Sequence, residues 1–242
     1  MARQARQDRA IRTRNTLVEA AATVFDQRGY EAATIGEIIS TAGVTKGALY
    51  FHFASKEELA FAVLDAQLAE EPLPVQPLKL QQLVDAGMVL AHRLRHDPLV
   101  RASVRLTLDQ GASGLDRRGP FLNWSAQNLQ MLAEARDNGE LLPHVVLEDT
   151  ADMFVGAFAG IQAMSQTLAD RGDLGHRTSV LFSHVLPCIT VPAVLASLDM
   201  AADRGERLLA SVRRADPAEG PRTELHEDTV EAQDTVGATP GK

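Results

Sequence analysis

Apolar residues recur every three or four positions along almost the whole chain up to residue 200, and no segment alternates regularly between apolar and polar residues. The first spacing gathers apolar side chains on one face of an α-helix, whereas regular alternation is typical of a half-buried strand. The chain is therefore predicted to be all-α. Helices are expected near residues 14–25, 35–42, 45–53, from 55 onward, and near 78–95, 98–110, 123–138, 147–170, 176–186 and 193–199 (its continuation through 209 left open), with a loop at 111–120.

Residues 34–53 predict two short helices joined by a tight turn. Thr34 and Glu37 match the Ser/Thr-x-x-Glu capping box, in which each side chain bonds the other residue's backbone N–H. Gly43 permits the positive φ that ends a helix, and Thr45 can cap the next helix. Two short helices joined by about three or four residues form a helix-turn-helix, whose second helix enters the major groove of DNA.

The second of these helices carries the donors and the small residues that a DNA groove favours. Lys46 can donate to guanine or phosphate oxygens, and the lack of bulk at Gly47 and Ala48 lets the backbone approach closely. Lys56 follows a predicted helix start at Ser55, where a phosphate is also favoured. The predicted DNA-contacting residues are Thr34, Thr45, Lys46, Gly47, Ala48, Tyr50, His52 and Lys56, with Leu49 and Phe53 pointing into the core. The simpler alternative places Tyr50, Phe51 and Phe53 all in the core.

Charge is distributed unevenly along the chain. The net charge is −8, yet the first fourteen residues carry five arginines against one aspartate and so a net charge of +4. A basic arm beside a helix-turn-helix can bind DNA phosphates, while an acidic remainder discourages nonspecific binding. The alternative is that the charged N-terminus only keeps the chain in solution.

Residues 14–64 resemble the DNA-binding domain of TetR-type repressors. The segment VTKGALYFHFASKEELA, together with Met1-Ala2-Arg3-Gln4 and Phe25-Asp26, is similar to the γ-butyrolactone receptor subfamily of actinobacterial TetR-type repressors. A thinner resemblance continues at 121–124, 160–162 and 186–192, to about residue 198.

The resemblance implies a three-helix N-terminal helix-turn-helix domain, followed by an antiparallel helical domain for ligand binding and dimerisation. It also implies a transcriptional repressor that binds operator DNA and is released by a small autoregulator, a γ-butyrolactone or a butenolide, in the control of secondary metabolism.

The second domain is expected to enclose a ligand pocket. Its apolar walls are predicted to come from Leu90, Val104, Leu108, Trp124, Phe158 and Ile161, which lie on helices that can surround a cavity. Trp124 adds a directed indole N–H, and the resemblance implies that it lines the pocket. The alternative is that Trp124 is an ordinary core residue.

Two glutamines are predicted to orient the ligand. Gln67 and Gln162 can each donate and accept a hydrogen bond with a lactone or butenolide ring, and the resemblance supports Gln67 more firmly. The alternative for Gln162 is a satisfied amide between helices. Related receptors can place a threonine two to three residues before Gln162, where this chain has Ala159 and Gly160.

The DNA-binding mode predicts a homodimer. Two reading helices must meet successive major grooves about 34 Å apart, on a pseudo-palindromic operator. The predicted interface lies on the later helices, with close approach at Gly156 and Gly160 and apolar area from Met153, Phe154, Ala157, Met164 and Phe182, some of which must instead be core. The helix that starts at 55 carries Lys56 at its DNA end and Gln67 about 16 Å further along, so a bound ligand is expected to tilt it and separate the reading heads.

Prolines and composition predict the domain limits. Pro72, Pro74 and Pro77 break the fourth helix, and the chain beyond residue 213 is rich in Asp, Glu, Pro, Gly and Thr. We expect an N-terminal arm and helix-turn-helix domain over 1–54, a helical ligand-binding and dimerisation domain over 55–200, and a largely disordered acidic tail over 201–242.

Enzyme and metal signatures are weak. The chain has no glycine-rich phosphate loop, no G-x-S-x-G elbow and no cysteine cluster, so neither an enzyme nor a cofactor is expected. His92 and His96 share a helix face and could hold a divalent metal, but the charged residues around them indicate a solvated surface, and no metal site is expected.

The single cysteine and the N-terminus favour a cytoplasmic protein. Cys188 excludes an intramolecular disulfide, and no apolar segment follows the N-terminal arginines as in a secretory signal. Residues 180–198 have the length of a membrane span, but they contain Pro187 and Pro192, so buried helix segments and no membrane partner are expected.

An alternative function on the same fold is a TetR-type regulator of antibiotic or drug efflux, or a pseudo-receptor that responds to an antibiotic. The pocket of an efflux regulator usually carries extra carboxylates or aromatics, and the predicted wall has no acid. The pI near 5.4 is, by association alone, typical of true autoregulator receptors.

Overall fold

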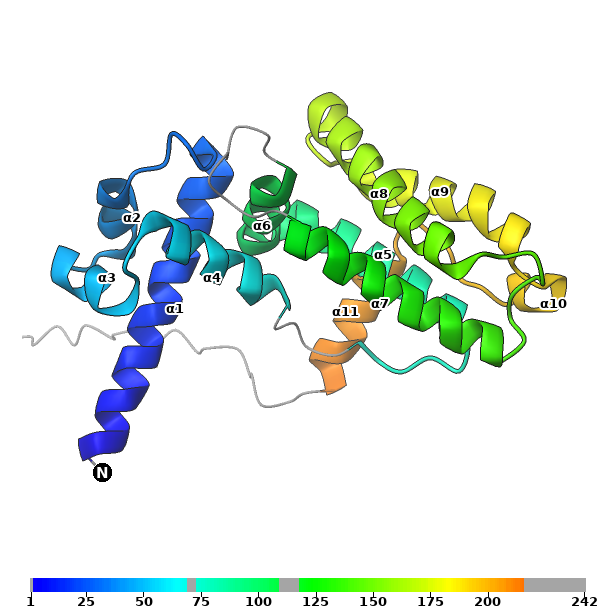
Figure 1. Cartoon of the computed structure of the whole chain (residues 1–242), viewed down its shortest axis with the longest axis horizontal. Coiled ribbons are helices and arrows are strands. Elements are labelled where there is room, and N and C mark those ends of the chain that lie inside the picture. The colour runs from blue at the N-terminus through cyan, green and yellow to red at the C-terminus, as the bar shows by residue number, and fades with distance from the viewer. Residues whose placement is uncertain (1, 69–72, 109–117, 216–242) are drawn as a thin grey trace, which may run out of the picture.

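The computed structural model describes residues 2–68, 73–108 and 118–215, and these form helices with one isolated β-bridge between Leu141 and Thr190. The helices, shown in Figure 1, are α1 (Ala2–Arg28), α2 (Ile35–Ala42), α3 (Lys46–His52), α4 (Lys56–Leu68), α5 (Lys79–His96), α6 (Pro98–Leu108), α7 (Arg118–Asp137), α8 (Leu147–Ala169), α9 (Leu174–Ile189), α10 (Pro192–Leu195) and α11 (Arg204–Ala215). The predicted all-α class is confirmed.

Two helices begin earlier than expected. α1 starts at Ala2 and not near residue 14, because alanine, arginine and glutamine favour a helix even where no apolar stripe exists. The basic arm is therefore a continuation of α1. α7 starts at Arg118, so 118–120 are helical where a loop was predicted, and the rest of that loop prediction, 111–117, lies outside the described residues.

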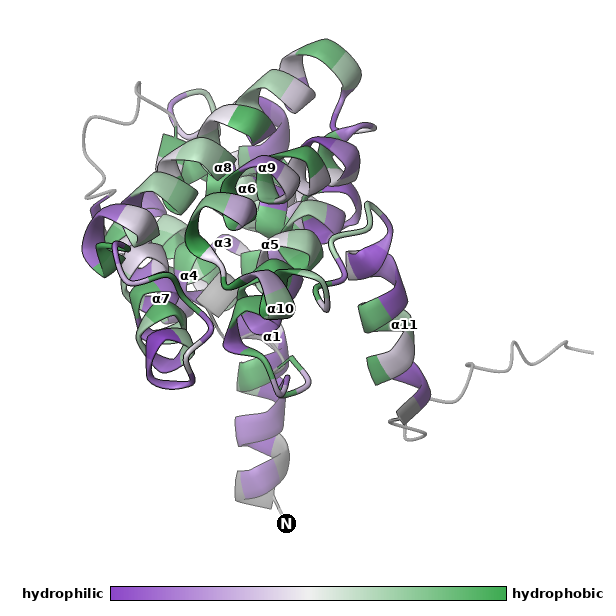
Figure 2. Cartoon of the chain, turned by 90° about the vertical axis from the view of Figure 1, so that its right-hand side faces the viewer, coloured by the Kyte–Doolittle hydropathy of each residue, from purple (hydrophilic) through white to green (hydrophobic). Residues whose placement is uncertain are grey.

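A helix occupies part of the segment that was predicted to be a disordered tail. Residues 204–215 form α11, which packs along α5, so part of the segment after residue 201 is helical and not disordered. Hydrophobic residues gather along one side of α11 in Figure 2, and among them Leu208 is buried. The segment is short and rich in arginine, and a single helix of this kind is stable only when it packs on a partner. The remaining tail, 216–242, lies outside the described residues.

A buried carboxylate anchors α11 to α5. The Asp85 side chain is 1% exposed and accepts hydrogen bonds from Nε and Nη2 of Arg204 at 2.8 and 2.9 Å. The side-chain amides of Gln76 and Gln81 donate to the same carboxylate at 2.7 Å each. A buried charge requires such partners, because an unpaired one is strongly destabilising. The segment before α5 and the C-terminal helix are thus held by one side chain.

The N-terminal helices share their core with α4 and α6. Buried side chains of α1–α4, such as Phe25, Leu49 and Leu59, form one cluster with Ala102 and Leu106 of α6. We call α1–α4 the reading head. Because α4 contributes to this core, the expected division between residues 54 and 55 does not separate two hydrophobic cores.

The sensor helices α5–α9 form the other part of the molecule. α5 lies centrally and packs against α7, α9 and α11, while α8 packs against α7 and α9 (Figure 1). Two further clusters of buried side chains fill this part, one around Leu80, Phe154 and Phe182 and one around Leu94 and Val100. Within the described residues, no helix combines the length and the apolar character needed to cross a bilayer.

Candidate DNA interface and ligand pocket

The caps and the turn predicted for the helix-turn-helix are confirmed. Thr34 Oγ1 accepts the Glu37 N–H at 3.2 Å, and the Glu37 carboxylate accepts the Thr34 N–H at 3.1 Å, which completes the capping box. Gly43 ends α2 with φ of 63°, in the left-handed region. Thr45 Oγ1 accepts the Ala48 N–H at 3.2 Å and starts α3. The chain therefore leaves α2 and enters α3 through bonds between near neighbours in sequence.

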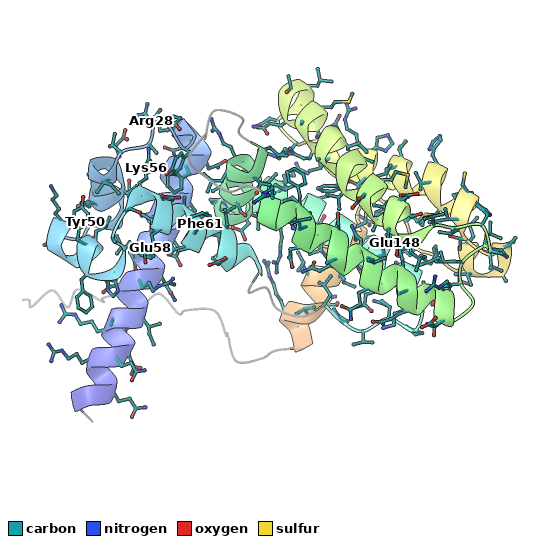
Figure 3. All side chains as sticks on the ribbon, viewed as in Figure 1. Arg28, Tyr50, Lys56, Glu58, Phe61 and Glu148 are labelled. Carbon is teal, nitrogen blue, oxygen red and sulfur yellow. The ribbon has the colours of Figure 1, made fainter. Side chains whose placement is uncertain are left out.

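One face of α3 is left open to solvent. Thr45, Lys46 and Gly47 are exposed, and Tyr50 is 48% exposed at the end of the molecule that lies away from the sensor helices (Figure 3). Ala48 and His52 are half-buried. Leu49 and Phe53 are buried, as predicted. The exposed face offers an ammonium, hydroxyls and an open backbone approach, which are the groups that base edges and phosphates bind.

Phe51 is a surface residue that the sequence interpretation missed. Its side chain is 80% exposed and meets the His52 ring edge-on, with ring centroids 5.0 Å apart. The helical phase could have revealed it, because a residue two positions after buried Leu49 lies on nearly the opposite side of a helix. The alternative that Tyr50, Phe51 and Phe53 are all core is therefore wrong for the first two.

Lys56 has a structural role within the reading head. Its ammonium donates to the backbone carbonyls of Tyr30 and Ala33 at 2.8 and 3.1 Å, with the Glu31 carbonyl at 3.4 Å. It also lies 4.5 Å from the centre of the Tyr30 ring. An ammonium has three donors, and these carbonyls occupy them. Lys56 thus ties the start of α4 to the turn after α1. Its phosphate contact stays a prediction.

Thr34 is likewise engaged within the chain. Its hydroxyl donates to the Glu37 carboxylate at 2.9 Å while it caps α2. Its DNA contact stays a prediction.

The basic arm is an exposed part of α1. The side chains of Arg6, Arg9 and Arg12 are exposed, and the N-terminal turns of α1 extend beyond the other helices of the reading head (Figure 1). Arg14 is also exposed, and its guanidinium lies over the Phe53 ring, 5.1 Å from its centre. The arm therefore presents positive charge beside the reading helix, as an electrostatic contact with a phosphate backbone requires.

A cavity of about 330 Å³ lies among the sensor helices, close to the lower end of the range typical of small-molecule pockets. All the predicted pocket residues with described side chains line it except Ile161, namely Leu90, Val104, Leu108, Trp124, Phe158 and Gln162. The sequence interpretation missed the further lining residues Leu73, Leu83, Ala86, Gly87, Val89, Gln127, Asn128, Met131, Phe154, Val155, Ala159 and Phe182. Ile161 is partly buried in the neighbouring cluster. Gln67 is in α4, but its side chain lies outside the described residues, so its ligand contact stays a prediction.

Aromatic rings and one glycine shape the cavity. Trp124 meets Phe121 edge-on at 5.7 Å between ring centroids, and Phe154 and Phe182 lie 6.0 Å apart. A Cβ on Gly87 would lie only 2.7 Å from Phe182 Cζ, so the absence of a side chain on α5 makes room for this ring. A pocket lined by rings with few polar groups favours a largely apolar ligand.

Gln162 brings a buried, unpaired side-chain oxygen to the pocket. The residue is 2% exposed, and within the described part of the chain its Oε1 has no hydrogen-bond partner. An unpaired buried acceptor costs roughly 1–3 kcal/mol, which a ligand donor would recover. The alternative of a fully satisfied interhelical amide is therefore wrong for this oxygen. Ala159, at the position where related receptors can have a threonine, also lines the cavity.

Several large apolar side chains of α8 and α9 are exposed to solvent. Met153 and Met164 are 41% and 52% exposed, Leu168 and Val180 are 68% and 41% exposed, and nothing lies within 4 Å of a Cβ placed on Gly156 or Gly160. Of the predicted interface residues, Phe154 and Phe182 are buried and line the pocket instead. We call the exposed set the outer face.

The two histidines considered for metal binding lie close together, with ring centroids 4.5 Å apart. Across the part of the chain that the structure describes, no group of three or more His, Cys, Asp and Glu side chains could hold a metal ion.

Known proteins resemble both parts of the molecule. Residues 17–63 match the family model described as bacterial regulatory proteins, tetR family. The chain is 37% identical to the A-factor receptor protein of Streptomyces griseus over 234 residues, which cover 93% of this chain and 84% of that protein. Two solved structures are similar: full-length TylP, a TetR regulator from Streptomyces fradiae (47% identity, TM-score 0.77, covering 88% of this chain and 95% of that chain), and CprB from Streptomyces coelicolor in complex with its biological operator sequence (30% identity, TM-score 0.63, covering 85% and 97%).

Proposed function

This chain belongs to the TetR family of bacterial regulatory proteins, in the group of the A-factor receptor, and we propose that it is a dimeric repressor that a small autoregulator releases from operator DNA. The proposed ligand is a γ-butyrolactone or a butenolide, and the proposed targets are genes of secondary metabolism. The observation that carries the ligand response is the apolar cavity with the unpaired Gln162 oxygen inside it.

The chemistry of the cavity supports an amphipathic ligand with one hydrogen-bonding end. Leu90, Val104 and Phe158 supply apolar contact for an alkyl chain, while the Trp124 indole can donate a hydrogen bond to a ring carbonyl. A hydroxyl on the ligand would satisfy Gln162 Oε1. The relationship to the A-factor receptor protein, together with the sequence resemblance to the γ-butyrolactone receptor subfamily, supports the same class.

α6 supports a mechanism for release, because it belongs to both parts of the molecule. Its residues Val104 and Leu108 line the cavity, while Ala102 and Leu106 are buried in the core of the reading head. A ligand that pushes on the first pair moves the second, since both lie on one rigid helix. A coupling of about 1–3 kcal/mol per site would weaken operator affinity by roughly 5- to 150-fold.

The outer face supports dimerisation. Exposed apolar side chains on adjoining helices, with two glycines that permit close approach, are typical of a surface that another protein chain covers. A second copy of this chain on that face would place two reading heads on one operator, as a pseudo-palindromic site about one helical turn in spacing requires.

A gel-shift titration on DNA from the protein's own promoter region, with and without defined γ-butyrolactones and butenolides, tests the proposal. Specific binding that a lactone abolishes at micromolar concentration supports it. Binding that ignores the lactones but yields to an antibiotic would favour the alternative of a pseudo-receptor or an efflux regulator. In parallel, quenching of Trp124, the one tryptophan of the chain, reports ligand entry into the cavity without DNA.

A further inference from the structure

A second cavity, separate from the ligand pocket, lies where the reading head meets the sensor helices. Its volume is about 420 Å³ and its walls are almost entirely polar. Asp26 of α1, Arg95 of α5 and Arg101 of α6 line it together with residues from the end of α8 and the turn that follows. We call it the junction cavity. None of its residues lines the ligand pocket.

Arg171 is the unusual member of the junction cavity. The residue is 6% exposed, and its Nη2 donates to the Gln166 side chain at 2.8 Å, but its buried Nε has no hydrogen-bond partner among the residues that the structure describes. No carboxylate among the described residues forms an ion pair with it. Buried charges in proteins are normally paired, so a guanidinium with an unused donor in a polar cavity indicates a missing partner.

The nearby carboxylates are committed elsewhere or exposed. The Asp26 carboxylate accepts a hydrogen bond from Arg101 Nε at 2.7 Å, and the Asp26 backbone carbonyl accepts one from Arg105. Asp170 is exposed. The lining therefore carries three arginines against two aspartates, and Arg105 adds a further positive charge beside it. The surplus is positive, which favours an anion and opposes a cation.

The electrostatic surroundings of Arg171 agree with this geometry. Burial lowers its pKa, an effect that Asp26 and Asp170 oppose and that the positive charges of Arg101 and Arg105 increase. The backbone also holds the side chain in an uncommon way, because Asp170 and Arg171 both have positive φ, 44° and 60°. Consecutive non-glycine residues in this region cost energy, so the turn keeps Arg171 directed inward against a local preference.

We propose that the junction cavity is a binding site for a tetrahedral oxyanion, a phosphate or a phosphoryl group, held by Arg171 and Arg101. Guanidinium groups bind such oxyanions through charge-assisted hydrogen bonds. The cavity is larger than one free phosphate ion, so inorganic phosphate and the phosphoryl group of a small metabolite share this chemistry and are distinguished by experiment.

Occupation of this site would join elements that the ligand response must move. Arg171 belongs to the turn between α8 and α9, and Arg101 belongs to α6. Asp26, which forms the ion pair with Arg101, belongs to α1. An anion shared by Arg171 and Arg101 therefore stabilises the arrangement of α6 against α8, and it adds an input that is independent of the apolar pocket.

The test is a thermal-shift and calorimetric titration of the full chain, without DNA or lactone, against phosphate, sulfate and a phosphorylated sugar, with chloride at equal ionic strength. The wild type is expected to show a saturable rise in melting temperature with a tetrahedral oxyanion. Stronger binding of the phosphorylated sugar than of free phosphate would assign the site to a metabolite, and the reverse to the inorganic ion.

Variants separate a built site from general salt effects. Arg171→Gln is expected to weaken oxyanion binding by about tenfold to a hundredfold, and Arg95→Gln, whose side chain is exposed and whose loss does not threaten folding, by a smaller factor. Arg136→Gln, an exposed arginine of α7 outside the cavity, is the charge-matched control and should bind as the wild type does. Equal binding by Arg95→Gln, Arg171→Gln and Arg136→Gln, or no saturable binding by the wild type, would overturn the proposal. Neither result would affect the lactone response, which the gel shift measures separately.

Discussion

The reading head and the ligand pocket treat their polar groups in opposite ways. In the reading head, the capping groups of Thr34, Thr45 and Ser55 are all paired with backbone N–H groups three residues away. In the pocket, Gln162 comes from a helix far along the chain and its oxygen is unpaired. Under the proposed function, the surface for DNA is organised before its partner arrives, whereas a ligand would supply the missing partner in the pocket.

The largest effect is expected from a substitution in the hydrophobic core beneath α3. Leu49→Ala deletes a side chain with 0% exposure and should lower the free energy of unfolding by about 2–5 kcal/mol. Urea denaturation followed by circular dichroism measures the loss. Operator binding should fall with it, and an exposed-site change such as Val75→Ala serves as the control. An unchanged urea midpoint would contradict the assignment of α3 to the hydrophobic core that the reading head shares with α6.

Two lysines separate contact with DNA from support of the reading head. Lys46→Met should weaken operator affinity by roughly 1–3 kcal/mol while the protein unfolds as before, since the side chain is exposed. Lys56→Met should instead lower the free energy of unfolding by about 1–3 kcal/mol, because it leaves backbone carbonyls without their donor. Gel shifts and urea melts of both variants provide the comparison. A loss of operator affinity in Lys56→Met without a loss of stability would support the phosphate contact predicted for Lys56.

Two further substitutions should change the free energy of unfolding by smaller amounts and in opposite directions. Thr34→Ala removes a satisfied cap and should cost about 1 kcal/mol of stability. Gln162→Leu removes an unpaired acceptor and should raise the stability of the ligand-free protein by about 1 kcal/mol, while it weakens ligand binding about tenfold. Thermal melts measure the two changes in stability, and Trp124 quenching measures the change in ligand affinity. Gln127→Leu, an exposed amide of the same cavity, should leave stability unchanged.

The smallest expected effect concerns pH at the contact between α5 and α11. Burial lowers the pKa of His92 below its usual 6.5, and His96 lowers it further, against a smaller opposing effect of Glu206. The unfolded chain then binds a proton more readily, so stability should decrease as pH falls below about 6.5. His92→Gln should reduce this decrease in melts between pH 7.5 and about 5.5, whereas His176→Gln, an exposed residue, should not. An identical pH dependence in all three proteins would exclude His92 as the cause.

The sequence alone was sufficient for features that depend on neighbours along the chain. The capping box at Thr34, the turn at Gly43 and the cap at Thr45 were all predicted, because their bonds span only a few residues. The helical periodicity also marked five apolar residues of the pocket wall, namely Leu90, Val104, Leu108, Trp124 and Phe158, because spacing along the chain indicates which face of a helix points inward.

Other features needed the packing of distant segments. Lys56 could be assigned to carbonyls near Tyr30 only once α4 was seen to lie against the turn after α1. The packing of α11 against α5 could be recognised only in the structure, because the pairing of Arg204 with Asp85 joins residues 119 positions apart. The unpaired groups of Gln162 and Arg171 are also tertiary facts. A buried group is unpaired only when none of its neighbours in space can bond to it. Those neighbours belong to several helices that are far apart in the sequence.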